Sequence, residues 1–168
     1  AKGEANGEGA RRDSLGNQYS GTFRNGVLEG KGIFRDDAGD QYSGEFRNDQ
    51  FEGTGRFQNA DGDVWFGRFK AGALSGPGEF IGTDGSRYQG EFRFWRFDGK
   101  GTLTRSDGQV YSGGFARGEY SGEGTLTRSD GSLQKGVWNA GQLRQDATGK
   151  RLPNPLEVGL LEQGALLE

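Results

Sequence analysis

This chain is built around one stretch, Gly30-Lys31-Gly32-Ile33-Phe34 followed by Gly39, Tyr42, Gly44 and Phe46. Residues 30–52 form a unit, and the same spacing of glycine and aromatic residues returns every 23 residues. A fixed period of this length is typical of a repeat array, in which each copy is one supersecondary unit. Six copies follow one another without insertion or deletion, starting at Gly7, Gly30, Gly53, Gly76, Gly99 and Gly122.

The composition fits such an array better than a conventional globular core. Only 30% of the 168 residues are hydrophobic and 34 are glycine, which leaves little apolar volume for two packed layers. Repeats that share a thin core with their neighbours need less apolar volume. Low hydrophobicity alone would predict disorder, but the regular aromatic spacing argues against that prediction.

The same composition argues against several classes of function. The net charge of −3 lacks the basic excess of a nucleic-acid-binding protein, so we expect no nucleic-acid partner. The chain has no cysteine and no histidine, which removes thiolate metal sites and the commonest metal ligand and general base. No run approaches the ~18 apolar residues of a membrane-spanning helix. We therefore expect no metal, no cofactor and no catalysis.

Each copy carries two strand patterns in which every second residue shares a face. In the first, residues 13, 15 and 17 of the copy are aromatic, glycine and aromatic, as in residues 42–46. The second runs across the border between copies, as in residues 51–57. Two-residue turns such as Asn25-Gly26, a strong hairpin signal, join the two strands. Six hairpins predict about twelve antiparallel strands.

The glycines within the strands predict how the sheet packs. Glycine weakens a strand interior, so its repeated use needs a physical reason. A bare glycine leaves room for a ring from a neighbouring strand to lie flat over it, and the rings then form ladders along the array. We expect an all-β fold, a single-layer, twisted antiparallel gutter about 50–60 Å long, from ~4.8 Å per strand.

This pattern of Tyr-x-Gly-x-Phe-x-Asn-Gly-x-x-x-Gly-x-Gly at 23-residue spacing resembles the MORN repeat (membrane occupation and recognition nexus), over residues 7–144. The resemblance implies an elongated, non-catalytic array of β-hairpins. Such arrays serve as protein–protein scaffolds, as dimerisation modules or as appendages of enzymes, and lipid binding is proposed for some. In bacteria, similar arrays precede catalytic domains, including legumain-type cysteine peptidases.

Three hypotheses for the function follow. The first is a scaffold module that presents an aromatic–glycine trough to a peptide, a partner chain, a second copy or an adjacent domain. The second is a regulatory or substrate-positioning arm of a larger enzyme. The third is binding to phosphoinositides or a membrane surface, which the net acidic charge makes a minor hypothesis.

The terminal copies and the C-terminal residues depart from the pattern. Arg11 stands where other copies have Phe34 and its equivalents, and Gln134 replaces the first aromatic of the last copy. Terminal repeats are usually atypical. Residues 145–153 are expected to be a polar linker. Residues 154–168 are expected to form a short amphipathic helix, either a cap on the array or the start of a further domain.

The candidate binding residues are the aromatics of the first strand pattern. They can be buried core, or they can line a trough, because one face of a single-layer sheet has nothing obvious to cover it. Both roles can hold together. The candidates are Tyr19, Phe23, Tyr42, Phe46, Trp65, Phe69, Tyr88, Phe92, Tyr111, Phe115 and Trp138.

One hairpin turn breaks the rule of the others. The fourth copy has Phe94-Trp95, flanked by Arg93 and Arg96, where other copies have pairs such as Asn25-Gly26. A bulky residue is disfavoured at a positive-φ position, so we expect this hairpin to turn differently. Phe94 and Trp95 either fill a gap on a neighbouring hairpin or, with the two arginines, anchor a partner or a dimer.

Other motifs favour structural roles. Gly30-Lys31-Gly32 lacks the spacing and context of a phosphate-binding loop. Residues 59–63 lack the later ligands of a calcium loop. Glu45 and Glu91 lie two copies apart with no expected pocket. Charged rows are expected at the two edges of the sheet: Arg24, Arg47, Lys70 and Arg93 at the turns, and Asp61, Asp84, Asp107 and Asp130 in the loops.

Overall fold

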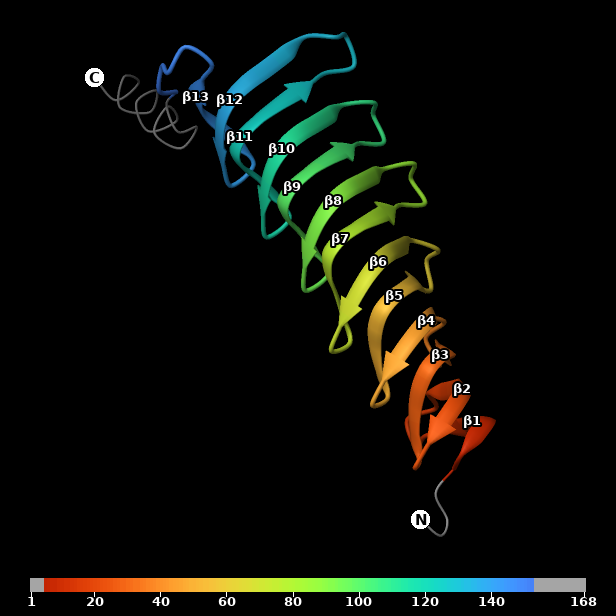
Figure 1. The fold of residues 1–168 in the computed structure, drawn as a ribbon. Coiled ribbons are helices and arrows are strands. Elements are labelled where there is room, and N and C mark those ends of the chain that lie inside the picture. The colour runs from red at the N-terminus through yellow and green to blue at the C-terminus, as the bar shows by residue number, and fades with distance from the viewer. Residues whose placement is uncertain (1–4, 153–168) are drawn as a thin grey trace, which may run out of the picture.

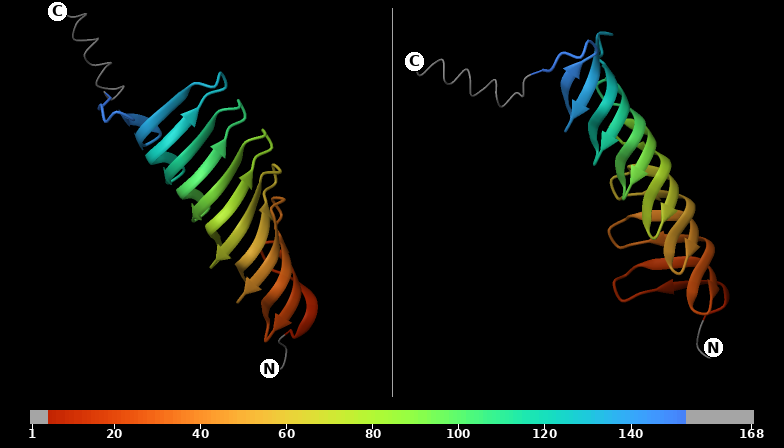
Figure 2. Two further views of the ribbon diagram at one scale, coloured as in Figure 1. Left: turned by 45° about the horizontal axis from the view of Figure 1, so that its top comes forward. Right: turned by 60° about the vertical axis from the view of Figure 1, so that its left-hand side comes forward.

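The computed structural model describes residues 5–152, which form one antiparallel sheet of thirteen strands (Figure 1). The strands are β1 (Gly7–Arg12), β2 (Gln18–Arg24), β3 (Val27–Arg35), β4 (Gln41–Arg47), β5 (Gln50–Gln58), β6 (Val64–Lys70), β7 (Ala73–Ile81), β8 (Arg87–Arg93), β9 (Arg96–Thr104), β10 (Val110–Ala116), β11 (Glu119–Thr127), β12 (Leu133–Asn139) and β13 (Gln142–Asp146). They pair strictly in chain order. The sheet is a long twisted ribbon of stacked hairpins, with β1 and β13 at opposite ends (Figure 2).

The predicted single-layer, all-β architecture is confirmed, and the sheet has thirteen strands where about twelve were predicted. Each copy begins within the second strand of a hairpin, so β1 is a second strand that precedes the first complete hairpin. The following twelve strands make six hairpins, the last closed by the short β13. Residues 5–152 contain no helix. The helix predicted at 154–168 lies outside the described residues.

The predicted linker at 145–153 overlaps ordered β structure. Strand β13 continues to Asp146, and Gln145 pairs with Arg151. Between them lies a tight loop, in which the Asp146 N–H donates to the Lys150 carbonyl and the Gly149 N–H to the Asp146 carbonyl. Some of the other loops also begin with aspartate and have glycine near the end, which are residue types that favour turns. Here the loop comes earlier and ends β13 at Asp146, so the last hairpin is shorter.

The turns have the predicted hairpin geometry, including the one expected to differ. Asn25 and Gly26 have φ of 49° and 82°, which is the type I′ pattern. Phe94 and Trp95 have φ of 48° and 71°, so our expectation of a different turn was wrong. The backbone is held in register because the Trp95 N–H donates to the Leu74 carbonyl at 3.0 Å, a bond that every turn makes to the preceding hairpin.

A continuous row of glycines crosses the sheet. Gly32 pairs with Gly44, and Gly44 with Gly55, and the same register continues along the array. A Cβ on Gly55 would lie 2.3 Å from the Tyr42 hydroxyl, which itself donates to the Glu45 carbonyl at 2.8 Å. The tyrosine ring thus lies over bare backbone, as the glycine spacing predicted.

From the second copy onward, the first glycine of each copy has a different role, because it sits in a bulge. Gly44 pairs with Gly55 and Phe46 with Phe51, so three residues of β5 face the single residue Glu45 of β4. Gly53, the middle one of the three, has φ of 68°. Bulges with a left-handed glycine bend a strand and increase its twist. Their repetition in each hairpin curves the strands (Figure 1).

Candidate binding trough

The aromatic face of the sheet is the inside of this curve, and we call it the trough. In a flat strand, Trp65 and Phe69 of β6 would lie about 13 Å apart, at ~3.3 Å per residue. The ring of Trp95, in the turn after β8, lies within 6.1 Å of the first and 5.4 Å of the second. It also reaches Phe57 near the far end of β5, at 4.9 Å. The turn edge therefore folds over the aromatic face.

Most of the predicted trough aromatics form the buried floor. Tyr19 and Trp65 are half-buried. The other nine are buried: Phe23, Tyr42, Phe46, Phe69, Tyr88, Phe92, Tyr111, Phe115 and Trp138. A single curled layer thus buries its own core, through ring contacts within one hairpin, such as Tyr42–Phe46, and between neighbouring hairpins, such as Tyr42–Phe69. These nine residues hold the fold together and do not reach solvent.

Three copies share one way of covering the glycine row. The tyrosine folds inward and stacks face to face on an aromatic of the next strand. The pairs are Tyr42–Phe51 at 3.9 Å, Tyr88–Phe97 at 3.9 Å and Tyr111–Tyr120 at 3.8 Å between ring centroids. Burial raises the pKa of Tyr42, and raises that of Tyr88 and of Tyr111 to about 12. The phenols are therefore neutral donors within the core.

Two other copies cover the glycine row with leucine. Leu28 and Leu74 stand where those copies lack the stacked aromatic, and both are fully buried. A Leu28 methyl lies 3.1 Å from where a Cβ of Gly32 would be. With the floor filled, the rings of Tyr19 and Trp65 remain half-buried above it. Leucine is smaller than an aromatic residue, so extra space remains at the mouth of the trough.

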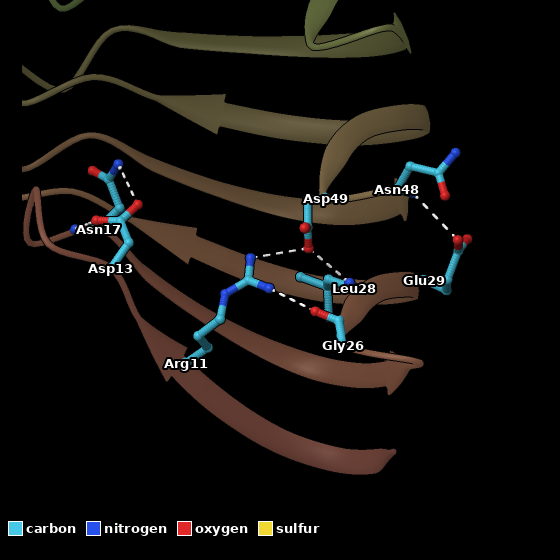
Figure 3. A network of polar contacts seen from close by, with 8 residues as sticks. All are labelled: Arg11, Asp13, Asn17, Gly26, Leu28, Glu29, Asn48 and Asp49. Atoms are coloured by element: carbon cyan, nitrogen blue, oxygen red, sulfur yellow. Dashed lines mark hydrogen bonds and ion pairs between the residues drawn. The ribbon is translucent and has the colours of Figure 1, made fainter. Parts of the chain in front are cut away.

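In the first copy this space holds an ion pair (Figure 3). The Arg11 guanidinium donates to the Gly26 carbonyl at 2.9 Å and to the Asp49 carboxylate at 3.0 Å. The same Asp49 oxygen accepts the Leu28 N–H at 2.8 Å. The guanidinium lies 4.8 Å from the centroid of the Tyr19 ring. Arg11, which departs from the repeat pattern in the sequence, therefore closes the trough at its N-terminal end.

In the third copy the same positions hold an aromatic pair. Trp95 takes the place of Asp49 in its turn, and Phe57 takes the place of Arg11 in its strand. Trp95 packs on Phe57, so it fills the gap over Leu74 from the next hairpin. Of the two roles we considered for Trp95, packing is the one that its contacts support. Phe94 remains 68% exposed, and Arg93 and Arg96 are exposed beside it.

The residues at the mouth of the trough come from the second strand pattern. The sequence pattern marks these residues as strand positions, and we did not predict them as binding residues. The signal was their place at the two ends of the Phe-x-Gly-x-Gly-x-Phe pattern. They are half-buried and touch the core from above: Phe34, Phe51, Phe57, Phe80, Phe97 and Leu103.

Toward the C-terminus the trough opens into a hollow of about 480 Å³. The turns of the fifth and sixth copies have Gly118 and Gly141 where Asp49 and Trp95 stand in others, so no side chain at this turn position closes the mouth. The hollow is lined by Phe80, Asp84, Ser86, Phe97, Leu103, Arg105, Ser106, Gly118, Glu119, Tyr120, Ala140 and Gly141. Its floor is apolar and its rim is charged.

Comparison with known proteins agrees with this repeating geometry. The family model of the MORN repeat matches five consecutive stretches, residues 19–41, 42–64, 65–87, 88–110 and 111–133. The chain belongs to the MORN repeat family. The matches begin at the first aromatic of each copy and leave out Arg11 and Gln134, the two departures in the terminal copies. A search of curated proteins gave no match.

Any function that we propose for this chain concerns the MORN array. Such arrays are typically non-catalytic, and no catalytic domain is detected beside this one. Within residues 5–152 there is no cluster of potential metal ligands and no helix long and apolar enough to span a membrane. Glu45 and Glu91 accept the N–H groups of Thr54 and Lys100, so they complete strand bulges.

Proposed function

We propose that this MORN array is a scaffold module that binds a protein or peptide along the mouth of its trough. The observation that carries the proposal is the half-buried row above the buried floor. Phe80, Phe97 and Leu103 touch the core on one side and solvent on the other. Apolar surface of this kind, with polar residues around it, is typical of interaction sites.

The opposite face of the sheet is a poorer candidate. Its side chains are mostly short or charged, as in Ser43, Lys100 and Glu123, which stand between the aromatic positions. Its apolar residues are few, such as Ile33, 39% exposed, and the cross-strand pair Val64 and Ile81. Scattered apolar residues are normal on a protein surface and need no partner.

The test compares one variant at the mouth with one on the opposite face. Arg11 shows that this fold accepts arginine at the place that Leu103 occupies in its own copy, so Leu103→Arg should fold. Ile33→Arg is the matched control on the other face. Affinity capture with the full chain should lose its partner with Leu103→Arg and keep it with Ile33→Arg. Equal capture by both variants would refute binding at the trough.

A second function rests on the row of basic residues at the turn edge. Arg24, Arg47, Lys70 and Arg93 are exposed, and none forms an ion pair within residues 5–152. Such a row could hold anionic lipid headgroups, with an attraction that salt weakens. Co-sedimentation with anionic vesicles at two salt concentrations tests it. No binding at the lower salt would exclude it.

A further inference from the structure

Leu143 of β13 is a third leucine on the glycine row, beside Leu28 and Leu74. Each of the three lies over the glycine seven residues before it in the chain. A methyl of Leu28, Leu74 and Leu143 lies 3.0, 3.1 and 2.9 Å, respectively, from where a Cβ of that glycine would be. The sixth copy therefore belongs with the first and the third, in which leucine forms the floor and the next turn fills the space above it.

This third leucine lacks the cover that the other two have. Leu28 and Leu74 are fully buried. Asp49 and Trp95, each in the next turn, cover them, and their N–H groups donate to the two leucine carbonyls at 3.2 and 3.0 Å. Leu143 is only half-buried, and β13 is the last strand in the described part of the chain. Apolar surface at this end of the trough thus lacks the residue that covers it in the equivalent copies.

The chain after β13 returns toward the place from which such a cover comes. Gln145 pairs with Arg151, and the Leu152 N–H donates to the Arg144 carbonyl at 2.6 Å. The backbone therefore runs back along β13 toward Gln142, and so toward the turn edge of the sheet. Leu152 lies beside the position that the next turn of a regular array would take.

Residues 153–168 carry the side chains that a cover needs. None of them is basic, and six are leucine or valine: Leu156, Val158, Leu160, Leu161, Leu166 and Leu167. The helix that the sequence predicts over 154–168 would place Leu156, Leu160 and Leu167 on one face and would be about 22 Å long, at ~1.5 Å per residue. From β13 back to β9 there are four strand spacings, about 19 Å. A segment of this length can cover both Leu143 and the hollow.

We propose that residues 153–168 fold back over Leu143 and occupy the hollow, which closes the trough at its C-terminal end. This inference rests on the proposed function, because it names a regulator of the same site. A partner that binds at Phe97 and Leu103 must first displace the segment. The apparent affinity for that partner is then reduced by the fraction of molecules in which the hollow is open.

The charges at the hollow do not select its occupant. Arg105 is a cation whose guanidinium donates to the Tyr120 hydroxyl at 3.4 Å, while Asp84 and Glu119 are exposed carboxylates on the same rim. The segment contains three glutamates, so it meets both attraction and repulsion there. Burial of its leucines on the apolar floor is therefore the contact that holds it.

Spin labelling locates the segment in the full chain. The protein has no native cysteine, so Glu162→Cys carries a nitroxide at a single site, on the predicted helix face opposite the three leucines. The nitroxide should broaden the amide NMR signals of Gly118 and Gly141 in its own chain and leave Gly26, in the first turn, unchanged. A mixture of isotope-labelled chains without nitroxide and unlabelled chains that carry it reports contacts between chains, and should show no broadening.

Two adjacent leucines provide a variant and its matched control. Leu160→Asp puts a charge on the face that packs in the hollow, so it should abolish the broadening at Gly118 and Gly141. Leu161→Asp makes the same substitution on another side of the segment and should leave the broadening in place. Capture of a partner by the full chain should rise several-fold with Leu160→Asp, because the competing segment is released, and should stay unchanged with Leu161→Asp.

Three results would overturn this closure of the trough. The first is no broadening at Gly118 and Gly141, the second is broadening only in the mixed sample, and the third is broadening that Leu160→Asp leaves unchanged. The proposed function is tested separately. If the segment stays away from the hollow while Leu103→Arg abolishes capture, the proposed function stands and closure is refuted. If the segment occupies the hollow while Leu103→Arg leaves capture unchanged, closure stands and partner binding at the trough is refuted.

Discussion

Gly55→Ala tests the reason for the glycine row. The three atoms nearest to a Cβ built on Gly55 all belong to the Tyr42 side chain, at 2.3, 2.4 and 2.5 Å. Tyr42 is fully buried, stacked on Phe51 and bonded to the Glu45 carbonyl. An added methyl must therefore displace the ring. Gly9→Ala is the matched control, because its Cβ would meet nothing closer than a Phe23 atom at 3.9 Å.

The expected cost follows from what the ring loses. Overpacking a dense core typically costs about 1–3 kcal/mol. Breaking the hydrogen bond from the Tyr42 hydroxyl adds about 1 kcal/mol. We expect Gly55→Ala to lower the free energy of unfolding by about 3 kcal/mol. Gly9→Ala should cost less than about 1 kcal/mol, since nothing has to move.

Urea unfolding followed by circular dichroism measures both values, and a double-mutant cycle isolates the cause. Tyr42→Ala should itself cost about 3–5 kcal/mol, the usual range for removing a buried ring. In that background Gly55→Ala should become nearly neutral, because the group it displaces is gone. If Gly55→Ala costs the same with and without Tyr42, the glycine does not serve to admit the ring.

Three further predictions concern packing and charge. Trp95→Gly should lower the melting temperature by several degrees, because lost contacts with Phe57 and its neighbours outweigh the relief of the positive φ; an unchanged melting temperature would mean that the ring contributes no packing. Unfolding free energy should fall as pH rises from about 10 to 12, by at most ~1.4 kcal/mol per pH unit for each buried tyrosine. The sign follows because the pKa values of Tyr88 and Tyr111 are raised on folding to about 12, so the unfolded chain loses these protons first; stability that stays flat in a pH titration to 12 would contradict their burial. Asp49→Ala should lower the free energy of unfolding in urea by about 1 kcal/mol, since it removes the carboxylate that accepts from the Arg11 guanidinium. An unchanged free energy of unfolding would show that this ion pair does not stabilise the fold.

The sequence predicted the fold well because its signals are local and repeated. Alternating aromatics and glycines fix which residues share a face, and turns such as Asn25-Gly26 fix the register of each hairpin. The curl of the strands could not be predicted in the same way, because it arises from bulges at residues such as Gly53. The alternation of residues along a strand does not distinguish these positions from ordinary strand positions. This curl buries Tyr42 and turns a predicted trough lining into core.

The site was predicted only in part for the same reason. Which side chain closes the mouth depends on contacts between neighbouring copies. Leu28 is covered by Asp49 and Leu74 by Trp95, from turns 21 residues later in the chain. No pattern within one copy reveals this. The position of Leu28 could have been compared, copy by copy, with the turn position 21 residues later. Where the first holds an aromatic residue the second holds glycine, and where the first holds leucine the second holds a larger residue.

We propose that partners bind this protein at the mouth of the trough. Site-specific photo-crosslinking tests it directly, with a photoreactive amino acid placed either at Leu103, at the mouth, or at Ile33, on the opposite face. Irradiation of the full-length protein under native conditions should give protein adducts from position 103 and none above background from position 33. Adducts formed only from position 33 would refute binding at the mouth of the trough.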